Sequence, residues 1–488
     1  MKLFTRLVMV GIIARFCAHA SAELLAQSEI AVLEALYNST AGQHWLWRTD
    51  ESLHGVPWNF TTDAASGQYL DDPCGGGWQG VQCSAACANS NNTSLLLPPL
   101  LLLLYPPCHL ADISLHGYGL DGSLPAALSA LRTLDLPDNP ALSGQIPASI
   151  GNMTSLTSVQ LQSALLSGTL PSSLGELLQL EVLDVHSNVL TGSIPPELGR
   201  LANLSSLKLY SNELGGAIPE SLGGLQSLRY LYLYNNALTN TVPSSLGDMT
   251  SLSYFILYNN HLNGTIPSSL GNLAQVKYFY LSGNELTGPI PSSLGNLSEA
   301  YYLWIHTNHL SGSLPAELGR LSGLHYLAAQ HNDLRGRLPA ELGALTALRY
   351  LYLYQNSLSG TIPPELAAMR GLRSMFLYEN SLTGTIPPSL AVMTGLQSLR
   401  LHSNSLTGPL PPRLPLSLDY LALDSNGLNG SLPDYLGNLT RLEVLLLNHN
   451  SFSGPLPASL SRLELLQLFY LDTNKLTGTL PNLSLTIT

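Results

Sequence analysis

The chain has 488 residues, of which only 11% are charged, and its formal net charge is −12 at pH 7. An acidic chain without a basic tract excludes nucleic acid and anionic membranes as general partners. Glycine and proline are frequent, which is typical of a chain whose turns recur on a fixed period.

Residues 1–22 have the composition of a secretory signal peptide. Lys2 and Arg6 precede an apolar run, and the segment ends in small residues at Ala20 and Ala22. This order predicts cleavage after Ala22 and a secreted or cell-surface protein. The alternative is an uncleaved anchor. No later run of about 18 apolar residues occurs, so the sequence predicts no further transmembrane segment.

Residues 23–109 are predicted to form an N-terminal cap. The segment 28–37 has the apolar spacing of a helix. An even number of cysteines at one end of an exported chain predicts a disulfide cap. These are Cys74, Cys83, Cys87 and Cys108. Of the three connectivities we favour Cys74–Cys83 with Cys87–Cys108. Residues 88–107 are of low complexity, and we interpret them as an insertion or as a mis-spliced coding segment.

A repeat begins near residue 110. From Asn188 to Asn404 an asparagine returns every 24 residues. Counted from it, leucine or a substitute fills positions −8, −5, −3, +2, +6, +10 and +13, glycine fills +4 and proline +7. The stretch from −6 to −2 alternates as a half-buried strand does. No unit can bury its leucines alone, so the sequence predicts a solenoid in which each unit adds one parallel strand.

This pattern is similar to that of the plant-type leucine-rich repeat family, whose units read LxxLxLxxNxLxGxIPxxLGxLxxL. The resemblance covers residues 110–481 in about 16 units, and residues 482–488 form a tail without a recognisable cap. It implies an α/β solenoid: a horseshoe with a concave parallel β-sheet, short 3-10 turns on the convex side and a disulfide-bonded N-terminal cap. Tyr118 and Ala164 replace the asparagine, and the unit that ends at Asn426 is two residues short. We expect looser geometry at these units.

Aromatic residues gather on the predicted concave face, at positions −6, −4 and −2. We predict that they bind a ligand, because tyrosine combines a rigid apolar ring with a polar tip. The predicted ligand-binding residues are Tyr230, Tyr232, Tyr234, Tyr254, Tyr258, Tyr278, Tyr280, Tyr302, Trp304, Tyr326, Tyr350, Tyr352, Tyr354, Phe376 and Tyr378. The competing interpretation is that tyrosine merely favours strands or was copied by duplication.

Position −7 forms a basic edge beside these residues, with Arg229, Lys277, Arg349 and Arg373. On an acidic chain this edge predicts a ligand that carries some negative charge. His186, His306 and His402 share position −2 but stand several strands apart, so we predict no metal site. The sequence also predicts no cofactor.

Asn-x-Ser/Thr sequons support the secretory route, although the repeat itself generates many of them. The candidate N-glycosylation sites are Asn38, Asn59, Asn91, Asn92, Asn152, Asn203, Asn263, Asn296, Asn429, Asn438 and Asn482.

The preferred interpretation is a non-enzymatic, extracellular recognition protein with a protein, peptide or oligosaccharide ligand and a membrane co-receptor. The family resemblance also implies two alternatives, an inhibitor of wall-degrading enzymes and the truncated ectodomain of a receptor-type protein kinase. A purely structural matrix protein is a further alternative, in which the aromatic residues bind nothing.

Overall fold

The computed structural model describes Leu33, Leu36 and residues 81–83, 110–115, 120–124 and 131–479. The chain forms two compact units, Met1–Leu238 and Thr239–Thr488, and each is described by itself.

Several predictions fall outside the described residues. These are the signal peptide 1–22, the insertion 88–107, the tail 482–488 and the side chains of the four cysteines. Of the predicted cap helix, Leu33 and Leu36 are described, and both are helical and fully buried.

The main sheet of the first unit begins with an antiparallel pair, β1 (Val81–Cys83) with β2 (Leu110–Ser114). Parallel strands follow in unbroken register: β4 (Thr133–Asp135), β6 (Ser158–Gln160), β8 (Val182–Asp184), β10 (Ser206–Lys208) and β12 (Tyr230–Tyr232).

The second unit repeats this arrangement with parallel strands only. They are β14 (Tyr254–Ile256), β15 (Tyr278–Tyr280), β17 (Tyr302–Trp304), β19 (Tyr326–Ala328), β21 (Tyr350–Tyr352), β23 (Ser374–Phe376), β25 (Ser398–Arg400), β27 (Tyr420–Ala422), β29 (Val444–Leu446) and β31 (Leu468–Tyr470).

Each repeat also carries a short second strand or a 3-10 helix, or both. The second strands are β3 (Asp121–Ser123), β5 (Ala141–Gln145), β7 (Leu165–Thr169), β9 (Val189–Thr191), β11 (Gly215–Ala217), β13 (Ala237–Thr239), β16 (Thr287–Pro289), β18 (His309–Gly312), β20 (Asp333–Arg337), β22 (Ser357–Gly360), β24 (Ser381–Gly384), β26 (Ser405–Gly408), β28 (Gly427–Ser431), β30 (Ser451–Pro455) and β32 (Lys475–Thr477). The 3-10 helices are η3 (Ala148–Asn152), η4 (Ser172–Glu176), η5 (Pro196–Arg200), η6 (Glu220–Gly224), η7 (Ser244–Asp248), η8 (Ser268–Asn272), η9 (Ser292–Asn296), η10 (Ala316–Arg320), η11 (Ala340–Ala344), η12 (Pro364–Ala368), η13 (Pro388–Val392), η14 (Asp434–Asn438) and η15 (Ala458–Arg462).

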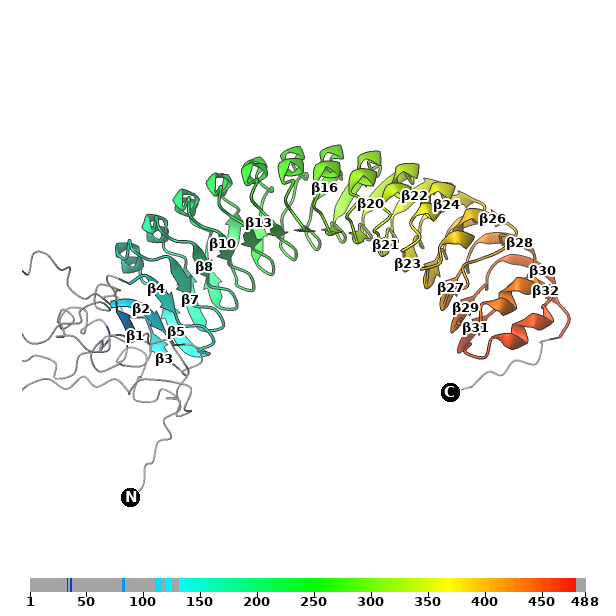
Figure 1. Cartoon of the computed structure of the whole chain (residues 1–488), viewed down its shortest axis with the longest axis horizontal. Coiled ribbons are helices and arrows are strands. Elements are labelled where there is room, and N and C mark those ends of the chain that lie inside the picture. The colour runs from blue at the N-terminus through cyan, green and yellow to red at the C-terminus, as the bar shows by residue number, and fades with distance from the viewer. Residues whose placement is uncertain are drawn as a thin grey trace, which may run out of the picture. The chain divides into compact units, whose positions relative to one another are not determined.

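Within each unit the main-sheet strands lie on one side and the 3-10 helices on the opposite side (Figure 1). The leucine positions lie between these two layers, and Leu324, Leu327 and Leu334 of one repeat are fully buried. The predicted solenoid with a parallel sheet and short helical turns is therefore confirmed, and its core is shared between neighbouring repeats.

The 3-10 helices begin where the repeat places its proline. Before η9, for example, Pro291 has φ −64° and ψ 134°, an extended conformation from which the helix starts. Gly295 lies inside this helix, and a Cβ there would clash with the carbonyl oxygen of Glu317 in the next repeat. The Leu-Gly pair of the repeat therefore allows adjacent helices to approach closely.

The repeated asparagine joins each repeat to the one before it. Asn332 is 9% exposed, and its Nδ2 donates to the carbonyl oxygens of Ala329 (3.2 Å), Gln330 (3.2 Å) and Ile305 of the preceding repeat (3.1 Å). Its Oδ1 accepts the backbone N–H of Leu310 at 2.9 Å. One amide thus satisfies four backbone groups at the end of a strand, which no apolar side chain could do.

The irregular units at Ala164 and Asn426 keep their sheet geometry, so the expected loosening is absent from the sheet, although the short unit lacks its 3-10 helix. Ala164 offers no acceptor, and the Leu142 N–H bonds instead to the Asn139 carbonyl oxygen at 2.9 Å. In the short unit Asn426 still donates to Leu401 O (3.0 Å) and accepts from Leu406 N (2.9 Å). Residues 409–419 of this short unit contain no 3-10 helix, and we attribute the loss to the two missing residues. Tyr118 is not among the described residues.

We expect Asn332→Leu to lower the free energy of unfolding by about 3 kcal/mol, because it leaves several buried backbone groups without partners. Asn272→Leu is the matched control, since Asn272 is exposed at the end of η8. Chemical denaturation followed by far-UV circular dichroism measures both. Equal stabilities for the two variants would show that the asparagine hydrogen bonds contribute nothing.

Candidate ligand-binding face

The predicted aromatic positions form three parallel columns on the main sheet of the second unit. The −6 column contains Tyr254, Tyr278, Tyr302, Tyr326 and Tyr350, the −4 column contains Tyr280, Trp304, Ala328, Tyr352 and Phe376, and the −2 column contains Tyr258, His306, Gln330, Tyr354 and Tyr378. We call these three columns the aromatic face. Because the strands pair in register, residues of one column lie side by side on neighbouring strands.

Rings within a column stack on one another. Ring centroids are 4.5 Å apart for Tyr254–Tyr278, 4.1 Å for Tyr280–Trp304 and 4.4 Å for Tyr354–Tyr378, with interplanar angles of 9°, 12° and 10°. Rings of adjacent columns meet edge to face instead, as in Tyr278–Tyr280 at 87°. The face is therefore a herringbone in which most rings expose an edge and a hydroxyl group rather than a flat surface.

The packing of the rings keeps the middle of the aromatic face uncharged. Burial, together with the neighbouring Tyr354, raises the pKa of Tyr378, and burial likewise raises that of Tyr326. Burial and the nearby His331 lower the pKa of His306 to about 4, so its imidazole is neutral at pH 7. These side chains therefore present hydrogen-bonding groups and apolar surface rather than charge.

At the C-terminal end of the aromatic face, the side chain of Arg400 contacts rings of two columns. The Arg400 guanidinium lies over the Phe376 ring at 4.5 Å and over the Tyr420 ring at 4.0 Å. His402 stacks on Tyr378 with centroids 4.3 Å apart. Sequence reasoning did not assign Arg400 and Tyr420 to the site, and the signal that could have found them is their place in the −4 and −6 columns beside Phe376.

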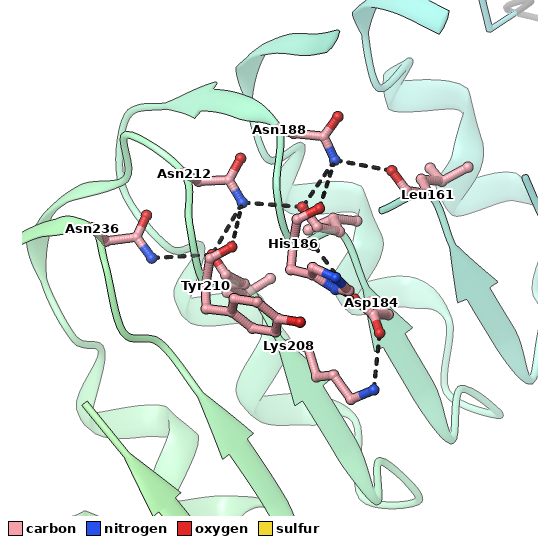
Figure 2. A network of polar contacts seen from close by, with 10 residues as sticks. Leu161, Asp184, His186, Asn188, Lys208, Tyr210, Asn212 and Asn236 are labelled. Carbon is pink, nitrogen blue, oxygen red and sulfur yellow. Dashed lines mark hydrogen bonds and ion pairs between the residues drawn. The ribbon is translucent and has the colours of Figure 1, made fainter. Parts of the chain in front are cut away.

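The first unit carries an aromatic group of its own on its main sheet, which includes Tyr230, Tyr232 and Tyr234 and also residues that sequence reasoning did not assign. Tyr234 stacks on Tyr210 with centroids 4.3 Å apart, and Tyr210 stacks on His186 at 4.1 Å. Figure 2 shows His186 and Lys208 converging on Asp184, beside the asparagine ladder.

Asp184 is buried, with 1% of its surface exposed, and lies on the same face of the sheet as Tyr210 and Tyr234. Its Oδ1 pairs with Nδ1 of His186, and its Oδ2 accepts from Nζ of Lys208 at 3.0 Å. Burial would raise the pKa of Asp184, but the hydrogen bonds and charges of His186 and Lys208 outweigh it and lower that pKa. This cluster fixes the His186 ring against which Tyr210 stacks.

The predicted basic edge is largely exposed. Arg229, Arg349 and Arg373 are exposed and Lys277 is half-buried, and Nη1 of Arg349 donates to the Gly371 carbonyl oxygen at 3.1 Å. No group of three or more metal-ligating side chains occurs within the described ranges.

The sequons that the structure describes carry exposed asparagines away from the aromatic face. They lie at the ends of 3-10 helices or on the second strands and their loops: Asn152, Asn203, Asn263, Asn296, Asn429 and Asn438. Asn38, Asn59, Asn91, Asn92 and Asn482 lie outside the described residues.

We expect Asp184→Asn to be less stable than the parent by about 2 kcal/mol at pH 6, because charge-assisted hydrogen bonds are lost. A carboxylate whose pKa is lowered by folding stabilises the folded protein at pH values above its ordinary pKa, near 4. This stabilisation is lost as the pH falls through the pKa of the folded state. The stability difference should therefore shrink below about pH 4. Denaturant titrations from pH 3 to pH 7 measure it.

Glu176→Gln is the control for this prediction. Glu176 pairs with Arg200 at 3.0 Å, but both side chains are about 60% exposed, so the change should cost less than about 0.5 kcal/mol. A pH-independent difference for Asp184→Asn would contradict the assignment of an ionised buried carboxylate.

Comparison with known proteins finds matches along much of the repeat region. A leucine-rich repeat family model matches residues 179–238, 202–262 and 226–286. A second leucine-rich repeat model matches residues 347–369, 395–415 and 441–463. In the part of the chain that the structure describes, no helix is long and apolar enough to cross a bilayer.

Solved structures with the same architecture come from plants and bacteria. A TDR receptor is 32% identical with a TM-score of 0.69, over 75% of this chain and 64% of that chain. The plant peptide hormone receptor RGFR1, in complex with RGF2, is 30% identical with a TM-score of 0.62, over 74% of this chain and 66% of that chain. The protein LIC12759 of Leptospira interrogans is 30% identical with a TM-score of 0.58, over 75% of this chain and 91% of that chain.

This chain thus spans somewhat less than two thirds of the TDR receptor structure. Its repeat motif, its parallel sheet and these matches agree with one another. The chain belongs to the leucine-rich repeat family, in its plant-type extracellular class.

Proposed function

We propose that this protein is a receptor-like recognition protein that acts outside the cell and binds an extended peptide on the aromatic face. The observation that carries the proposal is the herringbone of half-buried tyrosines, whose hydroxyl groups line one side of the sheet. The proposal involves no chemical step, because rings and hydroxyl groups of this kind act by contact and hydrogen bonding. A signalling role would require a membrane co-receptor.

The ring geometry favours a peptide over an oligosaccharide. Sugars bind aromatic residues by lying flat on exposed ring faces, but the faces of Tyr280 and Trp304 cover each other at 4.1 Å and 12°. The edges and hydroxyl groups that remain suit the alternating donors and acceptors of an extended backbone. The similarity to RGFR1, a plant peptide hormone receptor, supports the same ligand class.

The length of the face fits such a ligand. The −6 column of the second unit crosses five strands, from β14 to β21, which span about 19 Å at the usual strand spacing. An extended peptide covers this distance with roughly six residues. Sequons that point elsewhere leave room for the ligand if glycans are attached.

We expect the full chain to enrich linear peptides from a random display library, and the triple variant Tyr278→Ala, Tyr302→Ala, Tyr350→Ala to bind them at least tenfold more weakly. The physical reason is that removal of three rings of the −6 column breaks the surface on which the peptide lies. Calorimetric titration with a synthetic peptide measures the loss.

The control is the variant Tyr301→Ala. This tyrosine is 38% exposed and lies at position −7, outside the three columns. Equal binding by the triple and control variants would overturn the proposal. If an oligosaccharide binds to the three columns and no peptide does, the ligand of the aromatic face is a glycan and the proposed peptide is wrong.

A further inference from the structure

The −4 column is a stack of rings with one ring missing. Tyr280 stacks on Trp304 at 4.1 Å and 12°, and Tyr352 stacks on Phe376 at 4.5 Å and 3°. Between these two pairs, strand β19 places Ala328, which pairs in register with Trp304 on one side and Tyr352 on the other. Trp304 and Tyr352 are therefore two strand spacings apart, roughly 9.6 Å. One flat ring fits between two rings at this separation.

Tyr326 covers the vacant position. Its ring centroid lies 5.6 Å from Trp304 and 5.1 Å from Tyr352, and it meets both edge to face, at 63° and 79°. Tyr302, the preceding residue of the −6 column, lies farther from its own −4 neighbours, 6.4 Å from Tyr280 and 6.1 Å from Trp304. Tyr326 thus leans toward the −4 column, and Ala328 beneath it is only 1% exposed.

Two polar atoms beside this position have no partner in the protein. The Trp304 Nε1–H is buried without an acceptor, and the Gln330 Oε1 is buried without a donor. Gln330 is 7% exposed and lies two residues after Ala328 on the same side of the strand. Buried polar groups of this kind cost stability unless a partner reaches them. The vacancy therefore combines two flanking ring faces with an unused donor and an unused acceptor.

We propose that the position above Ala328 is a subsite for an aromatic side chain of the ligand, which enters between Trp304 and Tyr352 when Tyr326 turns aside. The ligand ring completes the −4 stack and gains two faces of contact. The amide groups next to that ring reach the Trp304 donor and the Gln330 acceptor. This subsite rests on the proposed function, since it assigns an aromatic residue to the peptide that the aromatic face binds.

The test uses N-acetyl-L-tryptophanamide as the probe and N-acetyl-L-leucinamide as its non-aromatic counterpart, titrated calorimetrically into the full chain. We expect Tyr326→Ala to bind the tryptophan probe about three- to tenfold more tightly than the parent, because the ring that occupies the vacancy is gone. Ala328→Phe fills the vacancy from below and should weaken the probe at least tenfold. Tyr301→Ala, an exposed tyrosine at position −7 and outside the three columns, should change binding less than twofold.

The subsite is overturned if Tyr326→Ala binds the probe no better than the parent, or if Tyr301→Ala or the leucine probe shows the same gain. The comparison of Tyr326→Ala with Tyr301→Ala decides the matter even if Ala328→Phe does not fold. The probe experiment needs no natural ligand, so its result is separate from the peptide library. Library peptides that bind the columns without an aromatic residue would retain the proposed function and reject the subsite.

Discussion

One kind of hydrogen-bonded side chain reinforces the register of the sheet in repeat after repeat. In each complete repeat an asparagine amide closes the end of its own strand and accepts an N–H from the preceding repeat, as Asn332 does for Leu310. These bonds reinforce the pairing of three-residue strands, and the unit at Ala164 keeps the same register through its backbone hydrogen bonds. Because neighbouring strands keep one register, side chains at equal positions come into line. The ring stacks of the aromatic face, such as Tyr280 on Trp304 at 4.1 Å and Tyr254 on Tyr278 at 4.5 Å, are a direct result of that alignment.

Most of the fold could be predicted because each repeat states the same pattern independently. The alternation around Leu327 identifies a half-buried strand, and the recurring proline identifies the start of a helical turn. The same alternation identifies which side chains share a face, so the three columns could be drawn before the structure was known. The prediction that failed concerned the units at Ala164 and Asn426, because a backbone donor such as Leu142 N finds another acceptor when the asparagine is absent.

Contacts between side chains of different columns could not be predicted in the same way. A column assignment places Tyr326 above its own strand, but the ring leans across Ala328 because a small neighbour leaves apolar surface uncovered. Likewise, nothing in the repeat pattern shows that Asp184 is buried by His186 from its own strand and Lys208 from the next. Such details depend on which residue types meet at one point of the sheet, and a periodic pattern does not contain that information.

The close approach of the 3-10 helices also governs how strongly the solenoid bends. Strands have a fixed spacing, whereas the spacing of the helices depends on the small residue that faces the next repeat. Gly295 lets its helix approach Glu317, but the corresponding residues of η12 and η13 are Ala367 and Ala391. An added methyl group takes up space in which the next helix lies, so we expect a wider outer layer and stronger local curvature at these alanines. The choice between glycine and alanine on one side of the repeat would in this way adjust the angle between neighbouring strands on the other.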